Sequence, residues 1–351
     1  MSRIGVGFAC LALMAGAWRA PAQAPGDSTR IRLILKGISA FEAGEFQTAV
    51  ERYSEALEAF PGDPAALYER AMAYSRLGEY DACVADGRAG LTGDSPLRPQ
   101  LYSMVGTCLA ADGRTEQAMD IFLEGLGQYP NDLGLNFNVA VTLTHAGQPG
   151  DARAYLKKVL TDEPNYPTAN LYLAQLFQAE GYRVPALYQY LRFLSVEPVS
   201  PRSASASTAV LELLSADVTE SADPEPVSTL LAGGPTDEGD FRLLGQGLSE
   251  LGRLDSPTGD SPPSPAARVA DIIESAVALA EEREEIQMRE TFVWEHAIRF
   301  MIDLRREGHL EPFTYLAFSQ LGLEGLDQWI ASHQREIDDL VIWLEANATP
   351  R

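Results

Sequence analysis

A period of 34 residues runs through the first half of this chain and constrains its fold more than any other feature. Glycines recur at intervals of 34 or 35 residues: Gly44, Gly78, Gly113, Gly147 and Gly181. Prolines keep the same step: Pro61, Pro96, Pro130, Pro164 and Pro198. So do two columns of small residues: Gly37, Ala71, Gly106, Ala140 and Ala174, then Ala49, Cys83, Ala118, Ala152 and Ala186. Four independent columns at one period indicate a tandem structural repeat.

The residue types in these columns indicate a pair of helices in each repeat. Each glycine lies between two helical apolar patterns, where a turn needs positive φ or close backbone approach. Each proline lies where the second helix must stop, and the small residues let paired helices approach closely. Larger side chains are expected to fill the core: Leu67, Tyr74, Tyr102, Leu109, Leu143 and Phe177 in first helices, and Tyr53, Phe122, Leu156 and Tyr190 in second helices.

This pattern resembles the tetratricopeptide repeat family, whose 34-residue unit is a helix-turn-helix. The resemblance covers residues 30–200, about half of the chain. It implies five repeats, at about 30–63, 64–98, 99–132, 133–166 and 167–200. Because one helix pair cannot bury its own apolar face, we expect an all-α fold in which the repeats stack into a right-handed solenoid with a concave inner surface.

The resemblance also implies where a ligand binds, because ligand-facing positions in this family lie on the first helix of each pair. Carried onto this chain, those positions are Ile34, Ile38, Tyr68, Met72, Ser103, Thr107, Phe137, Val141, Leu171 and Gln175. The Lys and Asn side chains with which some members hold an acidic C-terminal tail are absent from this set. We therefore expect a partly apolar groove for an apolar or amphipathic peptide. The alternative is that the protein's own chain covers these residues.

The first predicted helix is apolar on all sides, through Ile31, Leu33, Ile34, Leu35 and Ile38. A helix of this kind is normally buried by its own chain, by a second copy or by a partner. A homo-oligomer that stacks through this helix, as a self-assembling structural protein, is therefore one alternative.

The second repeat departs from the family pattern at Gly87 and Gly90. Each glycine inside a helix costs about 0.5–1 kcal/mol relative to alanine. The sequence therefore predicts a weak or bent segment over residues 84–95.

The first 24 residues have the parts of a secretory signal peptide. A basic start precedes an uncharged, mostly apolar run over residues 4–18, and residues 22–24 (Ala-Gln-Ala) have the A-x-A cleavage pattern. Cleavage after Ala20, or no cleavage, stays open because a proline follows residue 24. Cys10 lies inside the apolar run, which argues against a lipoprotein signal. We expect an exported protein, periplasmic or secreted, with no membrane insertion after cleavage.

The remainder of the chain changes character twice. Residues 201–264 are rich in Ser, Pro and acidic residues, which predicts a flexible acidic linker. Within it, residues 208–214 could form a capping helix, and residues 241–254 could dock onto a neighbouring part of the chain. Residues 265–347 return to helical spacing without the 34-residue columns, which predicts a small C-terminal helical domain. Its last helix is expected over residues 323–346.

No pattern in the sequence predicts a catalytic residue, a cofactor or a metal site. The histidines lack metal-ligand spacing: His145, His296, His309 and His333. No serine lies in a G-x-S-x-G elbow, and no P-loop lysine occurs. The acidic helix end at residues 281–285 could hold Ca²⁺ weakly, but a solvated helix face is the better interpretation.

Two cysteines, Cys83 and Cys108, lie outside the predicted signal peptide. An exported protein could form a disulfide between them. Both lie where small apolar residues pack, so we expect free buried thiols instead.

The net charge of the chain argues against nucleic acid as a partner. With 27 basic and 50 acidic residues its net charge is −23, so no basic face for nucleic acid is expected. The sequence predicts a non-enzymatic interaction scaffold or adaptor of the bacterial cell envelope, with a protein or peptide partner. The main alternative is an enzyme or small-ligand site in residues 265–347, with the repeats recruiting its substrate.

Overall fold

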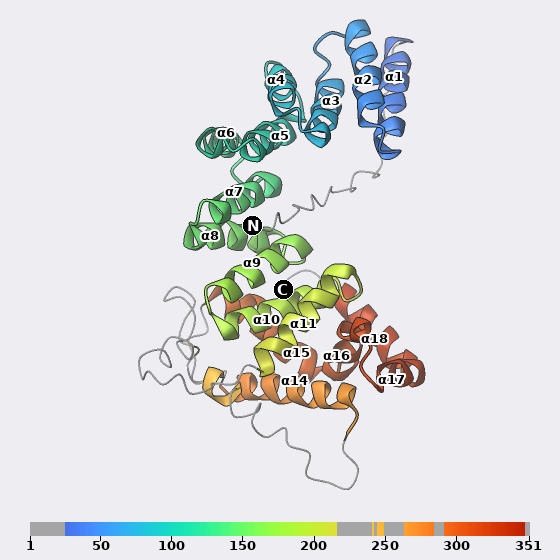
Figure 1. Cartoon of the computed structure of the whole chain (residues 1–351). Helices are drawn as coiled ribbons and strands as arrows, with labels where there is room; N and C mark the ends of the chain where they lie inside the picture. The colour runs from blue at the N-terminus through green and yellow to red at the C-terminus, as the bar shows by residue number, and fades with distance from the viewer. Residues whose placement is uncertain (1–24, 216–240, 242–243, 249–262, 284–290, 348–351) are drawn as a thin grey trace. The chain divides into compact units, whose positions relative to one another are not determined.

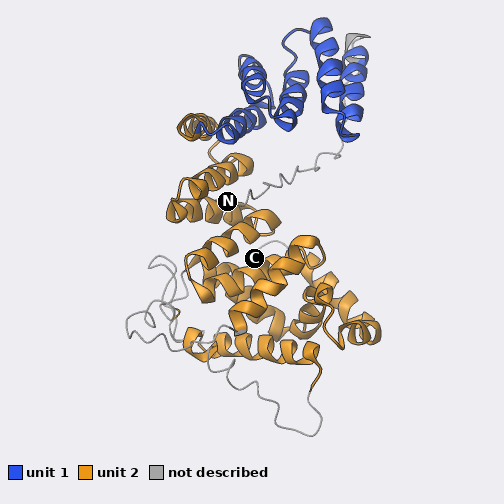
Figure 2. Cartoon of the chain, viewed as in Figure 1, with its two compact units in different colours: residues 1–114 blue, residues 115–351 orange. Residues whose placement is uncertain are grey.

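The structure is a computed structural model that describes residues 25–215, 241, 244–248, 263–283 and 291–347. Every regular element in these ranges is helical (Figure 1), so the predicted all-α fold is confirmed. The chain divides into two compact units, residues 1–114 and 115–351 (Figure 2). The predicted signal peptide and most of the predicted linker lie outside the described residues. None of the helices described is both long enough and apolar enough to cross a bilayer.

Unit 1 is built from consecutive antiparallel helices joined by short turns. They are α1 (Pro25–Glu42), α2 (Phe46–Ala59), α3 (Pro64–Leu77), α4 (Tyr80–Gly90) and α5 (Arg98–Ala111). The turns within the first two pairs contain Gly44 and Gly78, whose φ angles of 79° and 78° favour glycine. Each helix packs on the next, and the first helices α1, α3 and α5 also contact one another in order. This is the helix-turn-helix arrangement that the glycine and proline columns predict.

Small residues in unit 1 give room to large neighbours. Tyr53 of α2 is fully buried against Gly37 of α1, where a Cβ atom would lie 2.3 Å from the tyrosine ring. Polar contacts also join the helices, because Arg70 of α3 donates from Nε and Nη2 to both carboxylate oxygens of Asp86 in α4, at 2.7 and 2.8 Å. Its Nη1 donates to Ser54 Oγ of α2 at 2.9 Å. One guanidinium therefore connects three consecutive helices.

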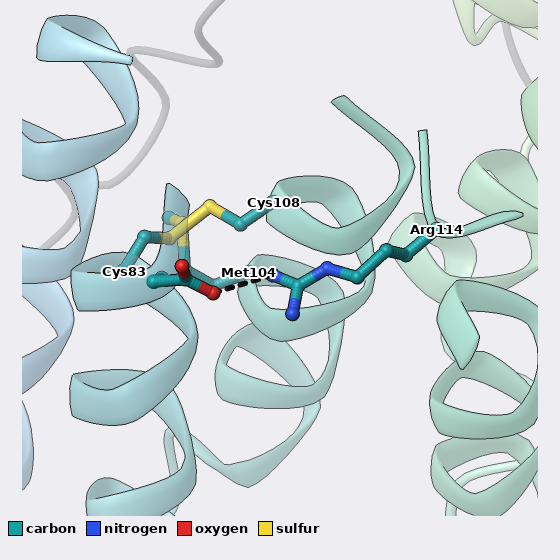
Figure 3. The surroundings of a disulfide bond; sticks show 5 residues. Cys83, Met104, Cys108 and Arg114 are labelled. Atoms are coloured by element: carbon teal, nitrogen blue, oxygen red, sulfur yellow. Dashed lines mark hydrogen bonds and ion pairs between the residues drawn. A yellow bond between two sulfur atoms is a disulfide. The ribbon is translucent and has the colours of Figure 1, made fainter. Parts of the chain in front are cut away.

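A disulfide joins Cys83 of α4 to Cys108 of α5, with their Cα atoms 6.4 Å apart (Figure 3). The prediction of free thiols is therefore wrong. Both cysteines do lie among small and apolar side chains, with Ala71 in the same buried cluster and Met104 Sδ 4.0 Å from Cys108 Sγ. The close helix approach that small residues permit is also what brings the two sulfur atoms within bonding distance.

The two glycines of α4 belong to the same helix contact as the disulfide. A Cβ atom at Gly87 would lie 2.5 Å from Val105 Cγ2, and one at Gly90 would lie 2.8 Å from Leu101 Cδ2. Along the two helices the order of contacts is therefore 83 with 108, 87 with 105, and 90 with 101. We call this row of contacts the α4–α5 seam. Gly87 and Gly90 leave space for the larger side chains of α5. They therefore have a packing role that helix propensity alone does not predict.

The substitution Gly87→Ala tests whether Gly87 mainly provides space for α5 or mainly weakens helix α4, because the two effects change stability in opposite directions. If Gly87 only weakened α4, alanine would stabilise the protein by about 0.5–1 kcal/mol. The seam predicts the opposite sign, a destabilisation of about 1–2 kcal/mol, because the added methyl group overpacks against Val105. Denaturant unfolding measures the difference.

Gly127 in α6 (Thr115–Gln128) is the matched control, because a Cβ atom there would meet nothing within 4 Å. Gly127→Ala should stabilise, and Val105→Ala should remove most of the cost of Gly87→Ala. A stabilising Gly87→Ala substitution would contradict the packing account.

Unit 2 begins with further helices of the repeat pattern and continues into the C-terminal helices. The first group is α6, α7 (Leu133–His145), α8 (Pro149–Asp162), α9 (Pro167–Ala179) and α10 (Arg183–Val196). The second is α11 (Pro201–Ser215), α14 (Pro265–Glu282), the π-helix η1 (Trp294–Ile298), α15 (Arg299–Arg306), α16 (Leu310–Ala317), the 3₁₀-helix η2 (Ser319–Leu321), α17 (Leu326–Ser332) and α18 (Gln334–Ala346). Across both units all the predicted core residues except Tyr74, which is half-buried, are buried.

Helix α10 is the centre of unit 2, because every residue from Val184 to Ser195 is buried. It contacts α9 on one side and α11, η1, α15 and α16 on others. Two long-range hydrogen bonds stabilise this packing. Tyr188 Oη of α10 donates to the Ala276 carbonyl in α14 at 2.8 Å. Ser207 Oγ of α11 donates to the Ala317 carbonyl in α16 at 2.7 Å. The C-terminal helices thus pack directly on the last repeat-like helix.

Two expectations about the C-terminal part need adjustment. The predicted capping helix at residues 208–214 is part of α11, which begins earlier, at Pro201, so the start of the predicted linker is folded. The single helix expected over residues 323–346 is instead two helices, α17 and α18, that meet at His333. The His333 ring stacks on Trp329 at 4.1 Å, and the Trp329 ring stacks on Tyr315 at 4.0 Å. The boundaries of the individual repeats stay a prediction.

Candidate functional site

The predicted groove residues of unit 1 differ in how much surface they leave for a ligand. Ile34 is buried in the core of the first helices, and Ile38 packs against the same core. Tyr68 and Met72 lie one turn apart on α3 and are half-buried. The remaining two, Ser103 and Thr107, are half-buried on α5, which packs beside α3. The apolar surface of this face is therefore supplied mainly by α3.

The predicted groove residues of unit 2 are centred on Phe137. Phe137 and Val141 on α7 and Leu171 on α9 are half-buried, whereas Gln175 on α9 is exposed. The Phe137 ring contacts Tyr166 at 5.8 Å and Tyr172 at 5.5 Å between centroids. Burial raises the pKa of both tyrosines.

We call Phe137, Tyr166 and Tyr172 the aromatic group. Sequence reasoning missed its two tyrosines, because Tyr166 precedes its helix and Tyr172 is outside the family positions. Only the ring contacts reveal them.

A cleft of about 640 Å³ opens in unit 2 between α10 and the C-terminal helices η1, α15 and α18. Its walls include the aromatic rings of Phe292, Phe300 and Trp343 and the side chains of Arg192 and His296. The volume is within the range of small-molecule sites. None of these residues is among the positions that the sequence pattern selects, because the cleft depends on contacts between distant parts of the chain.

Arg192 of α10 is the most buried charged group of the cleft, at 4% exposed. Its guanidinium donates to Ser195 Oγ at 2.9 Å and to Asn165 Oδ1, and the Phe300 ring lies 4.1 Å from its Cζ atom. Among the described residues its Nε atom has no hydrogen-bond acceptor. Burial lowers the pKa of Arg192 to about 10, so the group stays protonated at neutral pH.

His296 connects the C-terminal helices to α9. It lies in the π-helix η1, a rare geometry that often occurs at functional sites. Its Nε2 lies 2.8 Å from Asn170 Oδ1, which also accepts from Gln189 Nε2 at 2.6 Å. Because an amide oxygen only accepts, His296 Nε2 is the donor. Burial lowers the pKa of His296 well below its ordinary value, and the Arg192 cation lowers it further.

Asn170 also anchors the turn before its own helix. Its Nδ2 donates to the carbonyl oxygens of Pro164 and Tyr166 at 2.9 and 3.1 Å. One period earlier, Asn136 makes the same pair of contacts to Pro130 and Asp132 at 3.1 and 2.8 Å. Asn136 and Asn170 are 34 residues apart, so the period of the sequence also marks this turn contact.

The outer part of the cleft has arginines that are paired with carboxylates. Arg299 Nη1 lies 2.8 Å from Glu295 Oε2, and Arg306 Nε lies 2.8 Å from Glu281 Oε1. The carboxylates of Asp303 and Glu307 also line the cleft. Within the ranges described by the structure, no cluster of three or more His, Cys, Asp or Glu side chains is arranged to hold a metal ion.

The lowered pKa of the half-buried His296 predicts that unit 2 loses stability in mild acid. The unfolded histidine binds a proton below about pH 6.5, whereas the folded one does not, so stability falls as the pH drops below that value. Between pH 7 and 5.5 the expected loss is about 1 kcal/mol. His296→Gln keeps a donor for Asn170 and should remove this part of the pH dependence, measured by denaturant unfolding at each pH.

His145→Gln serves as the control, because His145 is exposed at the end of α7. This variant should follow the parent protein at every pH. An unchanged acid profile for His296→Gln would show that His296 is not held neutral by the fold.

Solved structures with similar folds cover about half of this chain. A thermophilic TPR protein of Thermus thermophilus is 23% identical with a TM-score of 0.45, over 52% of this chain and 99% of that one. The type IV pilus biogenesis factor PilW is 21% identical with a TM-score of 0.46, over 60% of this chain and 100% of that one.

Comparison of sequences identifies the repeat. The family model described as tetratricopeptide repeat matches residues 34–96. The small glutamine-rich tetratricopeptide repeat-containing protein 2 of Mycosarcoma maydis is 28% identical over 111 residues, 32% of this chain and 31% of that protein. The Hsp70-Hsp90 organizing protein of Triticum aestivum is 30% identical over 95 residues, 25% of this chain and 16% of that protein. The chain thus spans a third or less of the length of these relatives. The match identifies residues 34–96 of the chain as tetratricopeptide repeats, and the Mycosarcoma maydis relative carries the same repeat by name.

Proposed function

We propose that this protein is a non-enzymatic interaction scaffold of the bacterial cell envelope that binds an apolar or amphipathic peptide segment on its first helices. Proteins of the family act as scaffolds for protein interactions, through surfaces that stacked helix pairs create. One relative is by name an organizing protein for two other proteins. The observation that supports this proposal most is the apolar side chains on α3 and α7.

The chemistry of these side chains favours an apolar peptide. Tyr68 and Met72 present an aromatic ring and a flexible thioether, and both types are enriched where proteins meet. The aromatic group of unit 2 adds three rings, of which Phe137 was predicted as a contact residue. Such surfaces suit a helix or strand with apolar side chains at regular spacing.

Two features support an exported location. The predicted signal peptide would direct the chain out of the cytoplasm. The Cys83–Cys108 disulfide fits an oxidising compartment, because cytosolic proteins rarely keep such bonds. The periplasm, or secretion, accounts for both features.

Self-assembly is a second candidate, because Leu35 on α1 is 56% exposed. The predicted all-round apolar helix therefore does leave one large apolar side chain on the surface of the single chain. A second copy could cover it. Sedimentation of the protein at two concentrations distinguishes this candidate, since a constant monomer mass excludes assembly through α1.

The test of peptide binding uses the full chain and a displayed library of amphipathic helical peptides. Peptides that bind unit 1 should lose about tenfold or more in affinity with Tyr68→Ser plus Met72→Ser, and peptides that bind unit 2 should lose as much with Phe137→Ser. Each change removes apolar contact area at the centre of a first-helix face. Affinity is measured by fluorescence anisotropy.

Ile342→Ser is the matched control, because Ile342 is 64% exposed on α18 and far from the first helices in sequence. It should leave the affinity unchanged. Peptides that bind as before to both first-helix variants, and are lost with Ile342→Ser, would contradict the proposed surface.

A further inference from the structure

Arg192 is a buried cation that no carboxylate in the described part of the chain neutralises. Its guanidinium donates only to the neutral oxygen atoms of Ser195 and Asn165. A buried charge is costly unless an opposite charge accompanies it. Arg153 in the same unit shows the usual solution: it is 6% exposed and pairs with the carboxylate of Glu180.

The geometry of Arg192 leaves a place for an acceptor. Phe300 covers its guanidinium plane at 4.1 Å, and the buried Nε atom lacks an acceptor. Other buried side-chain atoms of the described residues, such as Gln100 Oε1 and Gln189 Oε1, also lack partners, so the missing countercharge and not the Nε atom alone distinguishes Arg192. Because Arg192 lines the 640 Å³ cleft, an anion in the cleft can reach it.

The other walls of the cleft define what kind of anion fits. Phe292 and Trp343 offer aromatic surface to an apolar group. Three carboxylates also line the cleft, against two further arginines, so the lining as a whole has no surplus positive charge for an anion of higher charge: Glu295, Asp303 and Glu307, with Arg299 and Arg306. A ligand with one negative charge and an apolar group fits both the aromatic walls and the charges of the cleft.

We propose that this cleft binds a monovalent carboxylate attached to an aromatic or apolar group. The carboxylate pairs with the Arg192 guanidinium, which has a planar donor set that matches a carboxylate. The apolar group lies against Phe292 and Trp343. Both a free aromatic acid and the carboxyl-terminal residue of a peptide have this chemistry. The cleft is separate from the proposed peptide-binding side chains on α3 and α7. Failure of the peptide-binding proposal would therefore leave this proposal unaffected.

The test titrates the full chain with N-acetyl-L-phenylalanine and with its amide, which differ only in the carboxylate. Isothermal titration calorimetry gives both affinities, and intrinsic tryptophan fluorescence, to which Trp343 of the cleft contributes, gives a second signal. The acid should bind about 10- to 100-fold more tightly than the amide, as expected for a hydrogen-bonded charge pair. Arg192→Met should abolish this preference.

Two further variants control for folding and for general charge effects. Arg299→Gln removes a cation at the outer part of the cleft and should change the affinity for the acid by less than about threefold, because exposed pairs contribute little. Glu307→Gln removes an exposed anion that lines the cleft and should tighten acid binding. Since Glu307 is exposed, this variant keeps the fold and tests the site even if Arg192→Met does not fold.

The remaining probes distinguish the source of the carboxylate. Preference for a tripeptide that ends in phenylalanine over 3-phenylpropionate would assign the cleft to peptide carboxyl termini, and the reverse would assign it to free acids. The proposal is overturned if the acid does not bind at about 10 mM, if acid and amide bind equally, or if inorganic phosphate binds more tightly than the acid. Equal losses with Arg192→Met and Arg299→Gln would overturn it as well.

Discussion

The fold depends on close contact between helices across small side chains. A helix pair of this length cannot bury its apolar face alone, so it needs neighbours, and neighbours can approach only where side chains are small. Gly37 beneath Tyr53 and Gly87 beneath Val105 show the same solution in two places. In the α4–α5 seam the approach is close enough for Cys83 and Cys108 to form a bond. The small residues recur with the 34-residue period because every helix pair needs this close approach.

Stacked repeats leave the last helix with an uncovered face, and unit 2 shows how this chain covers it. Helix α10 is buried along nearly its whole length because α11 and the C-terminal helices pack on it. The same packing produces the cleft and holds His296 against Asn170. It also buries Arg192 beside Phe300. The cap that completes the core therefore also creates the most chemically distinctive site of the molecule.

The sequence predicted what is periodic and local. The helix turns at Gly44 and Gly78, and the buried positions of Tyr53 and Phe177, follow from spacing and residue type alone. Local propensity misjudged Gly87, because its role depends on Val105 in the next helix.

The cleft was beyond sequence reasoning for a similar reason. His296 meets Asn170 across 126 residues, and no period relates the two positions. The disulfide was equally beyond reach, because spacing along the chain does not give the distance between Cys83 on α4 and Cys108 on α5.

Helix α10 and the C-terminal helices share one core, and native-state hydrogen exchange of the full chain tests this most directly. As denaturant increases, the amides of α10, α14 and α16 should lose protection together, with one free energy of opening. The hydrogen bond from Tyr188 to Ala276 and the packing of α10 on η1, α15 and α16 favour this result, because they join the two parts into one core. Loss of protection in residues 265–347 at low denaturant, while α10 stays protected, would contradict the account.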